Sequence, residues 1–205
     1  MIKIEHTEVF GWEAAIRGMR NPMNSWDKDD SCWSSGEGYV IGKNNHELMM
    51  KLAKGGSVHA KYRRMINVTL DITAPLYWWK EYDTYKVGTV ANSCSTMHKI
   101  HAKEFTLEDF SYEHLLPYAC DFGLMQIIGI LNMYREAYLE YKTKDFWYQM
   151  IQLLPSSYNQ KRTVQLNYEV LVGMYRDRKN HKLDEWRTFC EWIESLPYSE
   201  LITGE

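Results

Sequence analysis

Residues 70–99 read LDITAPLYWWKEYDTYKVGTVANSCSTMHK, and the rest of the chain is organised around this stretch. It combines aromatic rings, lysines and acidic residues with a run of Asn, Ser, Cys, Thr and His over 92–98. Ordinary core segments do not mix these groups, because a buried polar group without a partner costs about 1–3 kcal/mol. The composition therefore predicts that residues 70–99 form the wall of a polar pocket.

Hydrophobic periodicity predicts the elements on either side of this stretch. Residues 65–72 alternate apolar and polar side chains, which is typical of a half-buried strand, and 2–9 do so more weakly. A helix follows over 74–82, with Pro75 in its first turn, where proline is tolerated. Further helices are predicted over 11–19, 44–53, 113–142, 143–154, 165–175 and 182–196. Asn44 or Asn45 is the expected N-cap of the second of these, and the last five residues, LITGE, are expected to be frayed.

Bulk composition limits the classes of protein to consider. A chain of 205 residues with 45% hydrophobic content suits one domain with a full core. The net charge of −3 disfavours a general nucleic-acid-binding protein. The chain has no run of eighteen apolar residues and no apolar signal core, and its four cysteines lack zinc-type spacing, so no membrane span and no metal site are expected. These features predict a protein of the reducing cytoplasm.

The 15 Tyr and 8 Trp favour pocket walls and subunit interfaces.

A spaced set of residues marks the second half of the chain. Leu154-Pro155 is followed by Asn167 twelve residues after the proline, by Arg178 eleven residues later and by Trp186 eight residues beyond that. Eleven residues are about three helical turns, so Asn167 and Arg178 are predicted to point the same way from one helix. This set resembles the second half of the flavin-dependent thymidylate synthases.

The upstream half also resembles that family. His59-Ala60-Lys61-Tyr62 precedes the strand at 65–72 and the helix at 74–82, and a polar segment, Asn92-Ser93-Cys94-Ser95, follows. The order of elements matches over roughly 57–190, whereas 1–56 have no clear match. One motif differs: the family's Arg-His-Arg triplet falls on Lys80-Glu81-Tyr82, which retains only the first positive charge.

The resemblance implies an α+β fold in which a small antiparallel sheet packs with long helices. It implies a single domain over 1–205, with a divergent part at 1–56 and a family-like part at 57–196, that assembles as a homotetramer. The implied activity converts dUMP to dTMP with FAD, methylene-tetrahydrofolate and NADPH. By the same resemblance, His59, Lys80 and Asn167 would hold the flavin, and Ser95 and Arg178 the nucleotide. No catalytic side chain is assigned, because in that family the flavin carries the electrons.

Other interpretations remain open for the whole chain and for single residues. Loss of the triplet favours a non-catalytic nucleotide-binding protein on the same scaffold, acting as a sensor or a sequestering protein. A third class is an interaction protein whose aromatic residues form an interface. Cys94 or Ser95 with His98 could form a nucleophilic pair, although a polar loop is the simpler interpretation. Arg178 could be an ordinary solvated arginine, and His59 a buried histidine bonded to a backbone carbonyl.

Overall fold

A computed structural model describes residues 2–36 and 38–204 of the chain. Its main sheet has the strand order β1-β4-β6-β5, and a separate two-stranded antiparallel hairpin pairs β2 with β3. The strands are β1 (Lys3–Phe10), β2 (Cys32–Ser34), β3 (Gly38–Val40), β4 (Asn67–Pro75), β5 (Val90–Ser93) and β6 (Asn159–Asn167).

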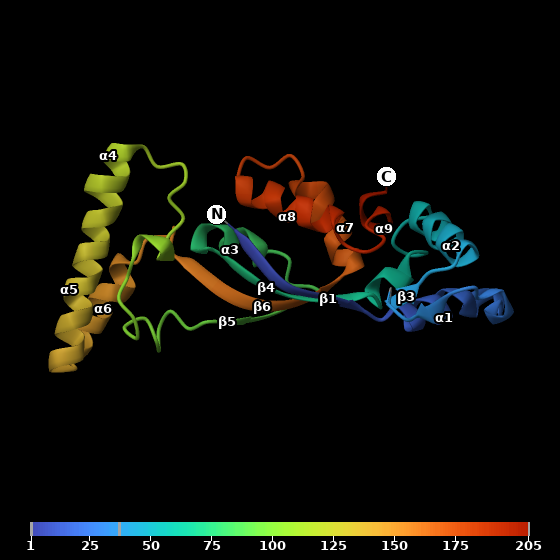
Figure 1. Cartoon of the computed structure of the whole chain (residues 1–205), viewed down its shortest axis with the longest axis horizontal. Helices are drawn as coiled ribbons and strands as arrows, with labels where there is room; N and C mark the ends of the chain where they lie inside the picture. Colours follow the sequence, from blue (N-terminus) through green and yellow to red (C-terminus); the bar gives the residue numbers. More distant parts are fainter. Residues whose placement is uncertain (1, 37, 205) are drawn as a thin grey trace. The chain divides into compact units, whose positions relative to one another are not determined.

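Helices make up most of the remaining regular structure (Figure 1). They are α1 (Trp12–Arg20), α2 (Lys43–Lys54), α3 (Leu76–Tyr82), α4 (Pro117–Ala119), α5 (Met125–Tyr141), α6 (Lys144–Leu153), α7 (Tyr168–Arg178), α8 (Asp184–Glu194) and α9 (Glu200–Thr203). Short 3-10 turns occur at η1 (Asn21–Met23), η2 (Trp26–Lys28), η3 (Lys61–Arg64) and η4 (Leu107–Asp109), and a π turn at η5 (Cys120–Leu124).

The predicted fold class is confirmed, because a small antiparallel sheet packs with several helices in an α+β arrangement. The alternating pattern of β4 is confirmed as well: Val68, Leu70 and Ile72 are at most 1% exposed, while their neighbours are half-buried. No helix in the described parts of the chain combines the length and the apolar composition that crossing a membrane requires.

The chain divides into two compact units, and β4 and β6 each contribute residues to both. Unit 1 contains Ile72–Thr84, Asn92–Thr163 and the chain's N-terminal residues up to Lys3. Within it, α5 and α6 run side by side (Figure 1), joined by the short link at Lys142 and Thr143. They share an apolar core with the loop before α4: Ile100, Phe105, Phe110, Leu124, Ile128, Leu131 and Met150.

Unit 2 contains Ile4–Asp71, Tyr85–Ala91 and the chain from Val164 onward. Its C-terminal helices α7, α8 and α9 pack on one another, and α7 also contacts η3. The largest buried side chains here are Trp186, Tyr168 and Phe189. The buried hydroxyl of Tyr168 has a hydrogen-bond partner, because it donates to the Pro197 carbonyl.

Three local predictions were wrong for identifiable reasons. The predicted helix over 165–175 begins only at Tyr168, because the residues before it form the polar strand β6. The N-cap of α2 is Gly42, and the cap is supplied from outside the helix: the Asp30 carboxylate accepts from the backbone N–H groups of Asn44 at 2.8 Å and Asn45 at 3.1 Å. The described residues of the LITGE segment, 201–204, are not frayed, since Leu201 in α9 is fully buried; Glu205 lies outside the described residues.

The interpretation of residues 70–99 as one pocket wall also needs correction. Trp78, Trp79 and Tyr82 are at most 2% exposed and pack against one another with ring centroids 4.9–5.2 Å apart. Trp79 donates its indole N–H to the carbonyl of Gln160 at 2.9 Å, which satisfies its polar atom inside the core. These aromatic residues are therefore core of unit 1, and only the exposed part of the stretch is available to a ligand.

Candidate functional site

Helix α7 carries the spaced pair that the sequence singles out. Asn167 ends β6 and is the N-cap of α7: its Oδ1 accepts from the backbone N–H of Val170 at 3.1 Å. Asparagine is a preferred N-cap because its short side chain satisfies one of the free N–H groups there. Asn167 and Arg178 therefore lie at opposite ends of one helix. At 1.5 Å per residue, the eleven-residue interval separates them by about 16 Å along the axis.

Arg178, the last residue of α7, lies among aromatic side chains. Its Nε donates to the Tyr85 hydroxyl at 2.9 Å, and its guanidinium lies 4.7 Å from the ring centroid of Trp186 and 5.5 Å from that of Tyr85. Trp186 is fully buried, so the ring on which the guanidinium packs is held in place. Cation–π contacts of this kind contribute about 0.5–2 kcal/mol, so the arginine is oriented before any ligand arrives. The solvated-arginine interpretation does not describe it.

One loop contacts both ends of α7. Tyr85 in this loop meets Arg178, and Gly88 lies against the start of the helix. Gly88 has φ +79°, and a Cβ there would lie 3.0 Å from Val170 Cγ2 and 3.3 Å from Asn167 Nδ2. A residue with a side chain would be strained by both the backbone angle and the close approach. We call Tyr85, Gly88, Asn167 and Arg178 the α7 strip.

His59 lies elsewhere in unit 2, in the turn between α2 and η3. The alternative interpretation of His59 as a buried histidine is wrong, because His59 is exposed. It lines a cavity of about 340 Å³ whose other walls are mostly apolar: Gly18, Met19, Pro22, Met23, Ser25, Leu48, Leu52, Val58, Lys61, Tyr62 and Met65. An apolar cavity with a few polar groups at its rim is typical of small-ligand sites.

Lys80 and Ser95 belong to unit 1. Lys80 is exposed on α3, whereas Tyr82, at the third position of the altered triplet, is core and cannot contact a ligand. Ser95 Oγ lies 3.1 Å from Nδ1 of His98 and accepts from the backbone N–H groups of Met97 and His98. Such bonds are those of an ordinary serine turn. No acidic partner for His98 is found among the described residues, so the pair lacks the third group that orients a catalytic base.

Sequence reasoning missed Arg162 on β6. Its guanidinium lies 4.1 Å from the ring centroid of Trp79, with Nη1 2.7 Å from the Asp83 carboxylate and Nε bonded to the Gln160 side chain at 3.0 Å. Arg162 therefore places a positive charge beside α3, in addition to the charge of Lys80 on that helix. No signal pointed to it, because β6 was not predicted as a strand.

Comparisons with known proteins identify the fold. No protein-family model matches the chain, and a search of curated protein sequences finds no match. Among solved structures, thymidylate synthase X from Helicobacter pylori, with FAD and dUMP, aligns with a TM-score of 0.70 and 14% identity over 100% of this chain and 98% of that one. A second structure of the same enzyme, also with FAD and dUMP, gives the same score and identity over 98% of each chain.

The chain has the fold of thymidylate synthase X. At 14% identity, the likeness to thymidylate synthase X concerns the backbone and not the side chains of a site. It extends through residues 1–56, where the sequence alone offered no match.

Proposed function

We propose that the protein is a flavin-dependent thymidylate synthase, which methylates dUMP to dTMP with methylene-tetrahydrofolate and takes its electrons from NADPH through FAD. The observation that carries the proposal is the α7 strip. Asn167 and Arg178 mark the two ends of one helix and meet the same loop. The fold on which they lie is shared with structures that contain FAD and dUMP.

In this proposal, Arg178 and Ser95 hold the nucleotide. A guanidinium presents several N–H donors in a planar fork that matches a phosphate. Arg178 Nε donates to the Tyr85 hydroxyl at 2.9 Å, and the Trp186 ring 4.7 Å away helps to orient the plane of the guanidinium. The Ser95 hydroxyl is exposed at the end of its turn and can rotate its proton toward a ligand.

His59, Lys80 and Asn167 would hold the flavin, and the described residues fit such a group in part. A flat ring system suits the apolar cavity beside His59, and that cavity of about 340 Å³ accepts one part of a dinucleotide. Lys80 is exposed and can neutralise a phosphate as a point charge. When bound, the flavin supplies the redox chemistry, and the chain supplies position and electrostatics.

The experiment is a paired assay on purified protein. The proposal predicts a yellow protein with a flavin absorbance band, and dTMP formation that requires dUMP, methylene-tetrahydrofolate and NADPH together. The Arg178→Ala variant should keep the flavin band and lose dTMP formation at limiting dUMP, because Arg178 is assigned to the nucleotide only. A colourless, folded protein that makes no dTMP after addition of FAD overturns the proposal.

A second function has one observation in its favour. Tyr82 stands in the core at a position where the family carries a ligand-binding arginine, so one positive charge of the triplet is missing from this place. A non-catalytic nucleotide-binding protein, a sensor or a sequestering protein, would need only the nucleotide half of the site. It predicts binding of dUMP without bound flavin and without dTMP formation.

A further inference from the structure

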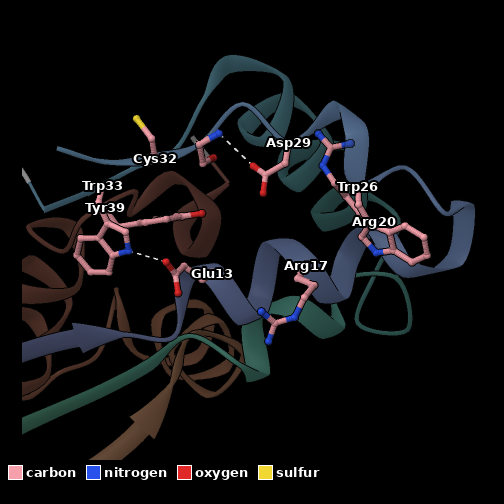
Figure 2. Close-up of a pocket in the computed structure, with 9 residues that line it drawn as sticks. Glu13, Arg17, Arg20, Trp26, Asp29, Cys32, Trp33 and Tyr39 are labelled. Atoms are coloured by element: carbon pink, nitrogen blue, oxygen red, sulfur yellow. Dashed lines mark hydrogen bonds between the residues drawn. The ribbon is translucent and has the colours of Figure 1, made fainter.

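A second cavity in unit 2 lies apart from the residues assigned above. It has a volume of about 490 Å³ and opens between α1, the loop after η2 and the β2–β3 hairpin (Figure 2). Its lining residues come from these three elements and from η2: Glu13, Arg17, Arg20, Trp26, Asp29, Ser31, Cys32, Trp33 and Tyr39. It shares no residue with the α7 strip or with the cavity beside His59. We call it the hairpin pocket.

Aromatic rings form one wall of the hairpin pocket. Trp33 and Tyr39, which pair across the β2–β3 hairpin, lie edge to face with centroids 5.3 Å apart. The indole N–H of Trp33 donates to Glu13 at 2.5 Å, which anchors the hairpin to α1, yet 68% of Trp33 is exposed. An exposed indole whose polar atom is already satisfied presents its apolar face, and such faces favour stacking with a flat ring.

The charged groups of the pocket differ in how far they are engaged by neighbouring residues. Both carboxylates already accept bonds: Glu13 from Trp33, and Asp29 from the Ser31 backbone N–H at 3.0 Å and the Asn45 side chain at 2.6 Å. Arg17, in contrast, has no hydrogen bond or ion pair to any other described residue. Free donors of a guanidinium attract an anionic group, with geometry suited to a carboxylate or phosphate.

Arg20 provides a fixed second cation at the same cavity. It is 4% exposed, and it is held by bonds from Nε to Asn45 at 2.7 Å and from Nη1 to the Ser25 carbonyl at 3.2 Å. Its positive charge therefore cannot swing away, whereas Arg17 on the exposed face of α1 can move to meet a ligand. The formal charges of the two arginines offset those of the two engaged carboxylates.

We propose that the hairpin pocket binds a small molecule that combines a flat heteroaromatic ring with one anionic group. The ring stacks on the wall made by Trp33 and Tyr39, and the anion meets Arg17. The volume of the cavity suits a ligand of the size of a mononucleotide. The site is independent of the proposed nucleotide site, which lies at α7.

Calorimetric titration of the intact chain with three probes tests this inference. Adenosine 5′-monophosphate carries both the ring and the anion, adenosine carries only the ring, and inorganic phosphate carries only the anion. The inference predicts that the monophosphate binds at least about tenfold more tightly than either of the other two, which corresponds to about 1.4 kcal/mol. Equal affinity for the monophosphate and for phosphate alone would show that Trp33 and Tyr39 bind no ring, and the inference would be wrong.

Variants locate the bound monophosphate. Arg17→Gln and Trp33→Leu should each weaken it about tenfold or more, while Lys51→Gln, at an exposed cation on α2 outside the pocket, should leave it unchanged. Arg17 has no structural partner to lose, so its variant is expected to fold. Arg178→Ala should also leave monophosphate binding unchanged. If binding is lost in Arg178→Ala and kept in Arg17→Gln, the probe occupies the α7 site and the inference is wrong, whatever the outcome for dUMP.

Discussion

The Nε of Arg178 donates to the hydroxyl of Tyr85 at 2.9 Å, which joins the end of α7 to a residue 93 positions earlier in the chain. This bond and the Trp186 ring orient a guanidinium that the sequence spacing had already singled out. An oriented cation loses less conformational entropy when it binds an anion than a flexible surface arginine does.

Replacing Arg178 should therefore weaken dUMP binding. We expect Arg178→Ala to cost about 1.5–3 kcal/mol of binding free energy, the size of a charge-assisted hydrogen bond, measured by calorimetry. Arg176→Ala is the matched control, because Arg176 is an exposed guanidinium two residues away that pairs with the adjacent Asp177. Unchanged affinity in Arg178→Ala would show that this arginine does not hold the nucleotide.

Gly88 offers a test of the loop that contacts both ends of α7. The Gly88→Ala variant would place a Cβ 3.0 Å from Val170 in a backbone with φ +79°. We expect a loss of about 1–2 kcal/mol in the free energy of unfolding, since alanine is disfavoured at positive φ. Gly56→Ala is a useful comparison: it has φ +87° but open space around the Cβ, so it reports the backbone cost alone. Equal losses in the two variants would mean that the contact with α7 is not tight.

Stability should fall at alkaline pH. Burial raises the pKa of the Cys190 thiol to about 11 and that of the Tyr62 hydroxyl to about 12, from ordinary values of 9.0 and 10.0. The unfolded chain therefore loses these protons first. The stabilisation is complete below pH 9 and is lost as the pH rises through 11 and 12, by at most about 2–3 kcal/mol per group.

Urea unfolding at pH 8, 9.5 and 11 measures this dependence. The Cys190→Ala variant should show a smaller decrease between pH 9.5 and 11 than the original chain, because it lacks the Cys190 thiol. A free energy of unfolding that stays constant or rises over this range would contradict the assigned shifts.

Apolar side chains on the helices of unit 1 lead us to expect an oligomer. Leu116 is 75% exposed, Tyr118 76% and Phe122 65%, and the two rings stack with centroids 5.0 Å apart. Large exposed apolar patches mark interaction sites. Light scattering should give a mass well above the 24.4 kDa of one chain, consistent with a tetramer. Phe122→Glu should lower that mass and Lys51→Glu should not; a monomer at micromolar concentration excludes the assembly.

The sequence predicted the parts of the fold that local pattern controls. Strict alternation of apolar and polar residues identified β4. The spacing of Asn167 and Arg178 correctly predicted a shared helix, although Asn167 caps it instead of lying within it.

The parts that were missed depend on distant partners. Strand β6 is mostly polar, and its buried residues are Gln160, Val164 and Leu166. Its strand structure therefore depends on pairing with the neighbouring strands β4 and β5 and not on its composition. Helix α9 has four residues, too few for a periodic pattern, and is stabilised by burial of Leu201. The contact between Tyr85 and Arg178 could not be predicted either, because the two residues are 93 positions apart in the chain.

Growth rescue tests the central claim most directly. The gene for this chain is expressed in a bacterium that lacks thymidylate synthase, on medium without thymidine. The proposed dUMP methylation predicts growth with the original chain, and much slower growth with Arg178→Ala at equal protein level. No growth with abundant, soluble protein of the original sequence would contradict a thymidylate synthase function and favour the non-catalytic nucleotide-binding protein.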